Sequence, residues 1–456
     1  MTLRRNQLAA LAAAIERVAR LDLPADAALS AFFRAHAEIG SHDRALVSDG
    51  AFAYLRRKAS LDTLAQTTDP RLLAYAVAVR EFGHSVREIE PAINAADARW
   101  LAGFKGRLHD ALAPAVAADV PDWLWHRLGD AFDDTTRSAL TRAWQQPAPL
   151  DLRVNVMKAT RNEARAALTA EGFRVSETPY APQGLRVEGR PSLARHPWLA
   201  DGRIEVQDEG SQLIGILVAP KRTDMVVDFC AGAGGKSLLL GAMMRSQGRL
   251  YAFDTVAKRL QRLTPRLARS GLSNVHPQVI AHERDAKVKR LAGKIDRVLV
   301  DAPCTGFGTL RRNPDLKWRQ TPNDLTELTA KQARILDAAA TLVKPGGRLV
   351  YATCSVLPEE NDAIVDAFLR KHDAFVERDA AQTLAEARVP LDTGPRLRLL
   401  PHVHHCDGFF AAVLERTSGS EQQVAPPAAR SRRVLYRATY CSDPEVARSL
   451  ALHFSA

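Results

Sequence analysis

The sequence predicts an α/β protein built around an open, doubly wound and mostly parallel sheet, and two observations predict this fold class. After Gly202, short apolar runs typical of strands alternate with stretches at helical spacing, as at residues 250–253, 258–270 and 296–300. In addition, the apolar run 225–229 ends in a glycine-rich turn that leads into Ser-Leu-Leu-Leu. Strand, tight turn and helix in this order are typical of a ligand-binding corner in such sheets.

The chain in front of this sheet shows two other patterns. In residues 1–118 apolar side chains recur at helical spacing, so we expect an all-helical domain. Residues 119–200 combine short alternating segments with a helical stretch at 162–171, which predicts a small α/β linking subdomain. We assign residues 201–416 to the sheet domain. Residues 417–456 are rich in Ser, Gln, Pro and Arg, which predicts a flexible C-terminal tail.

Composition limits the class of protein. With 46% hydrophobic and 25% charged residues, the chain is expected to be globular. Its net charge of +11 favours a polyanionic partner, because cations near phosphates gain from counterion release. No apolar stretch has the length of a membrane span. The five cysteines are odd in number and form no Cys-x-x-Cys pair, which argues against a disulfide framework and against a zinc site, and we expect no metal. We therefore expect a cytoplasmic protein with reduced thiols.

The glycine-rich turn is a candidate binding site for a nucleoside cofactor. Gly232 and Gly234 fit the first two positions of a dinucleotide-binding fingerprint, but Ser237 stands where the third glycine is expected. Asp254 ends the next predicted strand, at the spacing where an acid binds a ribose hydroxyl in such folds. The turn therefore predicts a nucleoside cofactor without deciding which one.

Two cysteines follow the ends of two predicted strands. Cys304 belongs to an Asp-Ala-Pro-Cys segment that begins at Asp301, and Cys354 is the centre of a Thr-Cys-Ser segment. A free cysteine often packs as a small buried hydrophobe, so each thiol alone is weak evidence for a function. Because ligands in open α/β sheets lie beyond the carboxyl ends of the strands, we expect both thiols in the pocket of the glycine turn.

The reaction that needs a thiol beside a methyl donor is methylation at a carbon that is not itself nucleophilic, such as C5 of a pyrimidine. A thiolate that adds to C6 turns C5 into an enamine carbon, which attacks the sulfonium methyl before a base removes the C5 proton. Asp301 is the candidate acid near N3 or O2 of that base. Nitrogen-methylating sites need no thiol and usually show an Asn/Asp-Pro-Pro-aromatic turn. The residues alone do not decide which of the two thiols attacks.

Several segments, in order along residues 200 to 415, resemble the bacterial RsmB/Fmu-type RNA (cytosine-5) methyltransferases. The matching segments are Gln207-Asp-Glu-Gly-Ser-Gln212, Cys230-Ala-Gly-Ala-Gly-Gly-Lys236, Asp301-Ala-Pro-Cys-Thr-Gly306, Arg311-Arg-Asn-Pro-Asp-Leu-Lys317, Lys344-Pro-Gly-Gly347 and Thr353-Cys-Ser355. The N-terminal half is similar in layout, since family members carry a NusB-like helical RNA-binding domain. Ser41-His-Asp-Arg-Ala-Leu and Leu55-Arg-Arg57 look like its pattern.

The resemblance implies a Rossmann-like S-adenosylmethionine methyltransferase domain and a role for each matching residue. It places Asp254 on the ribose of the cofactor, Asp285 near its adenine, and Asp301 between cofactor and base. It implies that Cys354 attacks the base and that Cys304 assists release of the methylated RNA. The segment expected around the methionine part of the cofactor is Cys230, Ala231, Gly232, Ala233, Gly234, Gly235 and Lys236. Two departures are Ala233, where many members have proline, and the Glu-Arg-Asp form of the segment that ends at Asp285.

The expected substrate is a cytidine in 16S ribosomal RNA, bound by a monomer. Arg311, Arg312 and Lys317 are expected to grip the RNA backbone near the pocket, although a charge run of this kind can also be a solvated loop. Three alternatives stay open: a transfer RNA substrate, an RNA-binding assembly factor that no longer reacts, and a nicotinamide dehydrogenase. Ser237 in the incomplete fingerprint argues against the dehydrogenase, and the pair of thiols argues against the inactive assembly factor.

Overall fold

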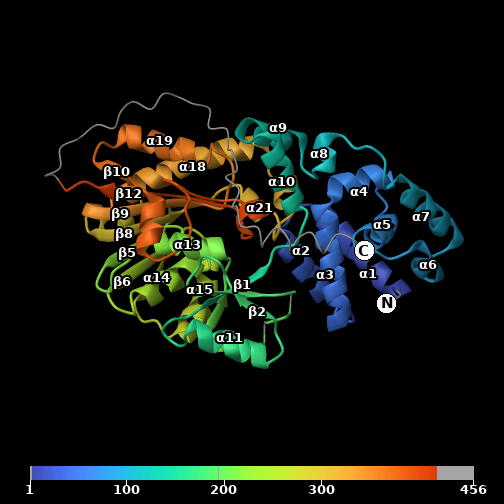
Figure 1. Ribbon diagram of the computed structural model, residues 1–456, viewed down its shortest axis with the longest axis horizontal. Coiled ribbons are helices and arrows are strands. Elements are labelled where there is room, and N and C mark those ends of the chain that lie inside the picture. The colour runs from blue at the N-terminus through green and yellow to red at the C-terminus, as the bar shows by residue number, and fades with distance from the viewer. Residues whose placement is uncertain (1–2, 190, 194, 419–456) are drawn as a thin grey trace, which may run out of the picture.

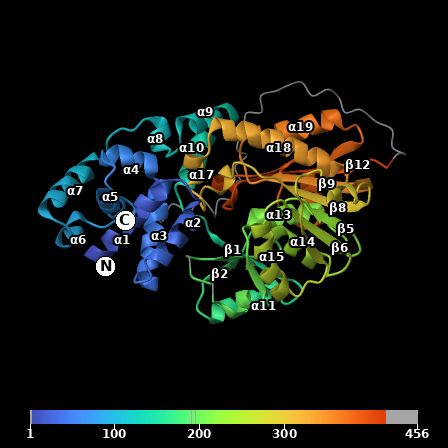
Figure 2. The same ribbon diagram turned by 180° about the vertical axis from the view of Figure 1, so that it is seen from behind.

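The computed structural model describes residues 3–189, 191–193 and 195–418. Except for Thr417 and Ser418, the predicted tail 417–456 lies outside the described residues. The molecule is elongated, with the N-terminal helices at one end and the large sheet at the other (Figures 1 and 2). Within the described ranges, no helix is both long enough and apolar enough to cross a membrane.

The N-terminal region is helical, and its helices pack around α1. The helices of this region are α1 (Arg5–Ala19), α2 (Ala25–Ala35), α3 (Ser41–Arg56), α4 (Lys58–Ala65), α5 (Pro70–Arg80), α6 (Val86–Ile89), α7 (Ala95–Arg107) and α8 (Pro114–Ala117). Leu8, Leu11 and Ile15 share one face of α1 and are buried. Gly50 of α3 lies against Leu11, where a Cβ would come within 2.5 Å of a leucine methyl. Helices α1 and α3 therefore pack in close contact.

Two further helices, α9 (Asp122–Ala131) and α10 (Asp134–Trp144), connect this region to the rest of the chain. The sequence patterns did not predict them, because residues 119–200 were assigned as a whole to a small α/β unit. Both helices bury apolar side chains in one cluster with Phe307 and Leu357 of the sheet domain. They therefore link the N-terminal helices to the sheet domain through packing as well as through the chain.

A small antiparallel sheet follows, with the strand order β2-β3-β1-β4. Its elements are β1 (Leu150–Val154), α11 (Arg161–Ala170), β2 (Val175–Glu177), β3 (Gly184–Val187), α12 (Pro197–Ala200) and β4 (Ile204–Val206). Strand β1 pairs with β3 on one side and with β4 on the other. Strand β4 lies beyond residue 200, so this sheet extends into the range that the sequence assigned to the next domain.

The large sheet has the order β10-β12-β9-β8-β5-β6-β7, and β11 pairs with β12. Its strands are β5 (Met225–Asp228), β6 (Arg249–Asp254), β7 (Val275–Val279), β8 (Ile295–Asp301), β9 (Val343–Thr353), β10 (Phe375–Arg378), β11 (Leu397–Leu399) and β12 (Phe409–Arg416). Strands β5 to β9 run parallel, whereas β12 is antiparallel to β9 and to β10. The predicted doubly wound, mostly parallel sheet is therefore confirmed.

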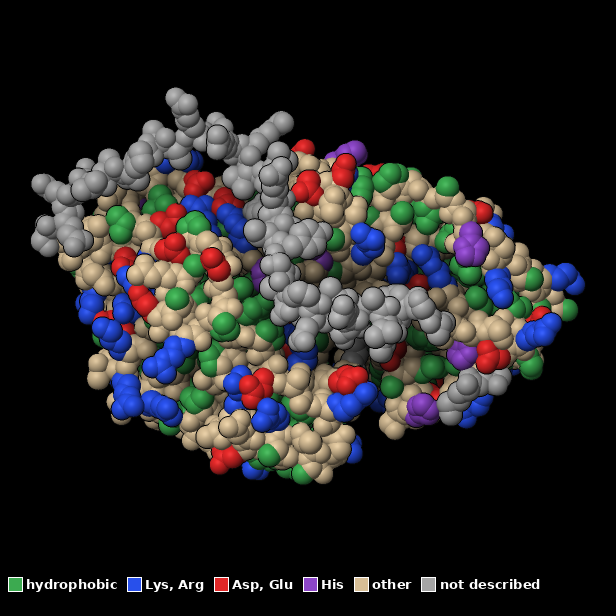
Figure 3. Space-filling model, viewed as in Figure 1, with side chains coloured by type: hydrophobic (Ala, Val, Ile, Leu, Met, Phe, Trp, Pro, Cys, Tyr) green, Lys and Arg blue, Asp and Glu red, His purple; other side chains and the backbone are tan. Residues whose placement is uncertain are grey.

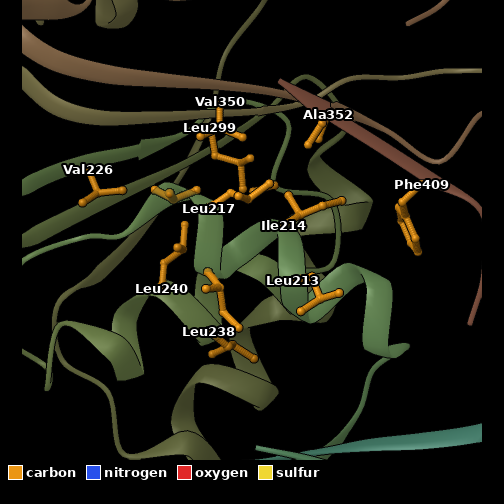
Figure 4. Packing of buried hydrophobic residues seen from close by; sticks show 14 of the residues in the cluster. Leu213, Ile214, Leu217, Val226, Leu238, Leu240, Leu299, Val350, Ala352 and Phe409 are labelled. Carbon is orange, nitrogen blue, oxygen red and sulfur yellow. The ribbon is translucent and has the colours of Figure 1, made fainter. Parts of the chain in front are cut away.

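Helices cover both faces of this sheet, which explains why its strands are almost continuously apolar (Figure 1). The helices of this domain are α13 (Glu209–Val218), α14 (Gly235–Met243), α15 (Ala257–Ser270), α16 (Ala286–Lys289), α17 (Leu316–Arg319), α18 (Pro322–Ala340), α19 (Asp362–Lys371), α20 (Ala380–Glu386) and α21 (Pro401–His404). Figure 4 shows Leu217 of α13 beside Leu299 of the sheet, with Ile214 and Val350 close by, and all four belong to one buried cluster. Helices α18 and α19 cover the opposite face.

The strand order places a crevice at the carboxyl ends of two neighbouring strands inside the large sheet. From β5 the chain proceeds outward to β6 and β7, and then returns to β8 and β9 on the other side of β5. The order reverses between β5 and β8, so the carboxyl ends of these two strands border a topological switch point. This is the position at which open α/β sheets bind ligands.

Candidate active site

A cavity of about 730 Å³ opens at this switch point. Its wall is formed by the turn after β5, by the ends of β6, β8 and β9, and by residues near β4 and α13. The polar and sulfur-containing residues in the wall are Gln207, Asp208, Ser211, Cys230, Lys236, Asp254, Thr255, Arg259, Arg266, Glu283, Asp301, Cys304, Arg312, Lys331, Cys354 and Asp407. Thiols, carboxylates and cations therefore meet in one space, as the strand-end rule predicts.

The glycine turn has the backbone that only glycine adopts readily. Gly232 has a φ of 57° and Gly234 a φ of 81°, both in the left-handed region. A Cβ at Gly234 would also lie 2.2 Å from a methyl carbon of Leu263. Helix α14 begins directly after this turn, so its first backbone N–H groups have no partner inside the helix and point toward the turn. Glycine is thus required here by conformation and by space.

Asp254 is held in the cavity wall by the backbone on either side of it. One carboxylate oxygen accepts the N–H of Gly232 at 2.9 Å, and the other accepts the N–H of Val256 at 2.7 Å. These contacts fix the carboxylate at the end of β6 next to the glycine turn. Its role as a ribose ligand stays a prediction.

The structure does not bring Asp285 into the cavity wall. Its carboxylate accepts the backbone N–H groups of Ala281 and Lys287, both at 2.8 Å, and so caps the short helix α16. These hydrogen bonds lower the pKa of Asp285 below its ordinary value. The neighbouring residues Ile280 and Glu283 line the cavity in its place. Asp285 therefore caps a helix outside the cavity wall, and its expected place near an adenine stays a prediction that this position does not support.

The two thiols predicted to share a pocket are in contact. The sulfur atoms of Cys304 and Cys354 lie 3.4 Å apart, and both residues are free cysteines. The hydrogen bond to Cys354 and burial raise the pKa of Cys304 well above its ordinary value. Cys304 therefore keeps its proton and can donate it in a hydrogen bond to the sulfur of Cys354.

An ion pair lies between the glycine turn and the thiols. The ammonium of Lys236 contacts the carboxylate of Asp301 at 2.7 Å, and the lysine side chain is only 11% exposed. Burial alone would lower the pKa of Lys236, but Asp301 and, to a smaller extent, Cys354 raise it above its ordinary value. A positive charge is therefore held permanently next to Asp301 and near Cys354.

Comparisons with known proteins agree with this geometry. The family model described as 16S rRNA methyltransferase RsmB/F matches residues 215–415, and the model for an RsmF/B-like ferredoxin-like domain matches residues 120–194. A ribosomal RNA small subunit methyltransferase B from Sodalis glossinidius is 30% identical over 406 residues, which cover 83% of this chain and 91% of that protein. The chain belongs to the RsmB/F methyltransferase family.

Other known proteins are similar to this chain in sequence or in fold. A probable ribosomal RNA small subunit methyltransferase B from Synechocystis is 36% identical over 300 residues, which cover 65% of this chain and 66% of the relative, just under two thirds of its length. Among solved structures, the protein PH0851 is 26% identical, with a TM-score of 0.74, and the match covers 91% of this chain and all of that one. The family and the fold that the sequence motifs predicted are thus confirmed.

The thiol side of the cavity depends on Glu360, a residue that the sequence motifs did not single out. Glu360 is fully buried, and its carboxylate accepts the backbone N–H of Thr305 at 2.8 Å and the hydroxyl of Thr305 at 2.5 Å. Gln332 donates to the same carboxylate at 3.0 Å and to the carbonyl oxygen of Pro303 at 2.9 Å. Burial raises the pKa of Glu360. Because Thr305 follows Cys304, this network fixes the segment that carries the thiol.

The basic segment that lies between Cys304 and Cys354 is more buried than an RNA-gripping loop is expected to be. Lys317 is 1% exposed and donates to the carbonyl oxygen of Arg56 in α3 at 2.9 Å, and Arg311 is 7% exposed. Trp318 donates to the carbonyl oxygen of Leu55 at 2.7 Å. This part of the segment joins the sheet domain to the N-terminal helices. Lys317 is therefore buried in a domain interface, and an RNA contact at Arg311 or Lys317 stays a prediction that their burial argues against.

Arg312 differs from its neighbours in the segment. It lines the cavity, and its guanidinium donates to Asp208 at 2.8 Å and to Asp407 at 2.5 Å. An RNA contact at this residue stays a prediction. On the face seen in Figure 3, Lys and Arg side chains are spread over the surface and interleaved with Asp and Glu.

Proposed function

We propose that this RsmB/F-family protein transfers a methyl group from S-adenosylmethionine to C5 of a cytidine in RNA, with 16S ribosomal RNA as the substrate. The contact between Cys304 and Cys354, at 3.4 Å and beside the pair of Lys236 and Asp301, carries this proposal. Methylation of a ring carbon that is not nucleophilic requires a thiol that adds to the ring, whereas methylation of a base nitrogen does not.

The residues of the cavity fit the cofactor. The glycine turn leaves the backbone bare on the cavity side, and the carboxylate of Asp254 lies at the position from which an acid binds ribose hydroxyls. The apolar side chains of Val256 and Ile280 line the same wall and offer a surface for a purine ring. When bound, S-adenosylmethionine supplies an electrophilic methyl group.

Each residue of the thiol side has a defined task in the proposed reaction. The thiolate of Cys354 adds to C6 of the cytosine, and the electron pair of the C5–C6 double bond moves to C5, which takes up the methyl group. Lys236 stabilises negative charge on Cys354 through its ammonium. Asp301 is the proposed acid at N3: its protonated carboxyl donates the proton that N3 takes up as the thiolate adds to C6, and receives it back when the C5–C6 double bond forms again.

Cys304 is proposed to act in the second half of the reaction. A base removes the proton from C5, the C5–C6 double bond forms again, and the sulfur of Cys354 leaves as a thiolate. The raised pKa of Cys304 supports this assignment, because Cys304 stays a thiol at neutral pH and can hydrogen-bond the departing sulfur. Without Cys304 the covalent adduct is expected to persist.

The substrate is proposed from the family. The Synechocystis and Sodalis relatives are named for the methylation of small-subunit ribosomal RNA, and the matched family model is described by 16S rRNA. Incubation of the protein with labelled cofactor and either 16S ribosomal RNA or transfer RNA separates the proposed substrate from the alternative. Methylation of transfer RNA but not of 16S ribosomal RNA would contradict the ribosomal assignment.

Single cysteine variants test the mechanism. Cys354→Ala is expected to abolish methyl transfer and to form no adduct, whereas Cys304→Ala is expected to leave a protein–RNA adduct that survives denaturing electrophoresis. Cys406→Ala is a matched control, because Cys406 is buried in the core outside the cavity wall and should methylate as the wild type does. Activity of Cys354→Ala would show that the nucleophile is wrong, and an adduct in that variant would show that the two roles are reversed.

A further inference from the structure

The small α/β sheet reaches the glycine turn directly through one buried arginine. Arg153 lies on β1 and is 3% exposed. Its guanidinium donates to the carbonyl oxygen of Gly235 at 2.7 Å and to the side-chain oxygen of Gln207 at 2.5 Å. Burial lowers the pKa of Arg153 to about 10, so the guanidinium still carries its charge at neutral pH. A fixed cation of one domain thus contacts the backbone of the turn in another.

A second arginine binds the same turn and is oriented by the small sheet. Arg266 of α15 donates to the carbonyl oxygen of Ala233 at 2.6 Å. Its other nitrogens donate to the carboxylate of Glu205, on β4, at 2.8 and 3.1 Å. Glu205 is 4% exposed, and its second oxygen accepts from Arg269 at 2.7 Å. Glu205 therefore determines where the guanidinium of Arg266 lies.

These contacts restrain the N–H groups that the turn offers to a ligand. A peptide group is planar and trans, so fixing the carbonyl oxygen of Gly235 also fixes the direction of the N–H of Lys236 on the opposite side. That N–H belongs to the first turn of α14, where backbone donors have no partner inside the helix and are available to an anionic group. A turn rich in glycine has many accessible conformations, and two guanidinium groups on its carbonyl oxygens favour one of them.

We propose that Arg153 and Glu205 are positioning residues for the cofactor, so that the small α/β sheet is a structural part of the cofactor site. This inference rests on the proposed use of S-adenosylmethionine. It assigns to the small sheet a task within the methyltransferase reaction: this sheet holds the turn in the conformation that binds the cofactor.

Replacing Arg153 is expected to weaken cofactor binding more than it affects the reaction. In Arg153→Met the dissociation constant for S-adenosylhomocysteine and the KM for S-adenosylmethionine should rise about tenfold, because a charge-assisted hydrogen bond to the turn is lost. The kcat at saturating cofactor should stay within about twofold of the wild type, since the thiols and Asp301 are untouched. In Arg153→Lys one ammonium can still reach the carbonyl oxygen of Gly235, so partial recovery of affinity is expected.

Lys158→Met is the matched control for loss of a contact between the same two regions. Lys158 donates to the carbonyl oxygens of Asp201 and Arg269, both at 2.7 Å, and so joins the small sheet to the end of α15 without touching the turn. Its affinity for S-adenosylhomocysteine should stay at the wild-type value. Should Arg153→Met fail to fold, Glu205→Gln replaces it, since the amide keeps the shape of the carboxylate while weakening its hold on Arg266.

Calorimetric titration of the full-length variants with S-adenosylhomocysteine, together with their thermal unfolding midpoints, tests the proposal. Weaker binding in Arg153→Met or Glu205→Gln, with Lys158→Met unchanged, is the expected result. Equal affinity in all variants would overturn it, and so would equal weakening in Lys158→Met, because domain docking in general would then be responsible. A wild-type protein that binds no S-adenosylhomocysteine would count against the proposed function, which separates the two failures.

Discussion

The two sides of the cavity are held by opposite charges. On the side of the glycine turn, cations bind carbonyl oxygens, as Arg153 does at Gly235 and Arg266 at Ala233. On the thiol side an anion binds donors, since Glu360 accepts from the backbone and the hydroxyl of Thr305. The cations are positioned by the small sheet, whereas Glu360 belongs to the sheet domain itself.

This difference indicates that the turn side and the thiol side of the cavity are held by separate hydrogen-bond networks. In the turn, the backbone itself forms the binding surface, and its carbonyl oxygens are restrained from outside. On the thiol side, side chains carry the proposed chemistry, and a buried carboxylate fixes the segment that presents Cys304. Changes in one network should therefore alter cofactor affinity and leave the thiols intact, while changes in the other should do the reverse.

Among the residues that hold the two sides of the cavity in place, the largest effect is expected for Glu360→Gln on the thiol side. The amide keeps the shape of the carboxylate but is neutral and has only one oxygen to accept from Thr305 and Gln332, so the segment that carries Cys304 should be held less firmly and should shift. A shift of about 1 Å at a reacting group can reduce the rate about 100-fold, and we expect kcat to fall by that order. The affinity for S-adenosylhomocysteine should stay within about twofold. Methyl transfer at saturating substrate and calorimetric titration measure the two quantities.

Glu359→Gln is the control for this prediction. Glu359 is the sequence neighbour of Glu360, but its side chain is 36% exposed and pairs with Arg127 at 3.2 Å on the surface. Its variant should methylate at the wild-type rate, because an exposed ion pair contributes little. If Glu360→Gln also kept the wild-type kcat, the carboxylate would not position the thiol segment, and the contrast between the two sides of the cavity would disappear.

An intermediate effect is expected on the turn side, in Gly234→Ala. The new Cβ would lie 2.2 Å from a methyl carbon of Leu263, at a φ of 81° that alanine disfavours by about 1–2 kcal/mol. We expect the turn to shift and the affinity for S-adenosylhomocysteine to fall about tenfold. The rate at which iodoacetamide labels Cys354 should not change.

Gly293→Ala is the control that separates the effect of the steric clash at Gly234 from the effect of backbone strain. Gly293 has a φ of 66° with open space around its Cβ position, and it lies outside the cavity wall. Its variant should lose stability and keep its cofactor affinity. Slower labelling of Cys354 in Gly234→Ala would show that the two networks are coupled, against the separation drawn above.

Local motifs predicted one part of this site, and contacts between distant segments determined the other. The glycine turn and the two thiols each lie at the end of a strand, so the position of the strand ends in the sheet was enough to place them together. Glu360 and Arg153 could not be predicted in this way, because their partners, Thr305 and Gly235, are brought to them only by the folded chain.

The basic segment shows the same limit from the other direction. In the sequence, Lys317 has the charge and the neighbours of an RNA-binding loop. In the structure, the docking of the N-terminal helices buries it against α3. Whether a lysine in a charge run is exposed depends on the surface of another domain, which a local pattern does not contain.

The smallest effect on activity is expected for Lys317→Met. Replacing a buried lysine and replacing an exposed one should affect RNA affinity differently. Lys331→Met is therefore the matched variant, because Lys331 is exposed and lines the cavity. RNA affinity should be unchanged in Lys317→Met. In Lys331→Met both the RNA affinity and its salt dependence should fall, because an exposed lysine beside the cavity can contact an RNA phosphate. Weaker RNA binding in Lys317→Met alone would restore the original interpretation of the segment. Binding titrations at several salt concentrations measure both quantities.

Lys317 should instead affect how stability depends on pH. Burial lowers its pKa to about 7 from an ordinary value of 10.5, so between these values the unfolded chain binds more protons than the folded one. The free energy of unfolding of the wild type should therefore rise, relative to that of Lys317→Met, as the pH increases from 7 to about 9.5. Below pH 7 the lysine is charged in both states, and the difference between the two proteins should be constant. Urea unfolding across this range tests the prediction, and a constant difference up to pH 9.5 would mean that Lys317 keeps its proton in the interface.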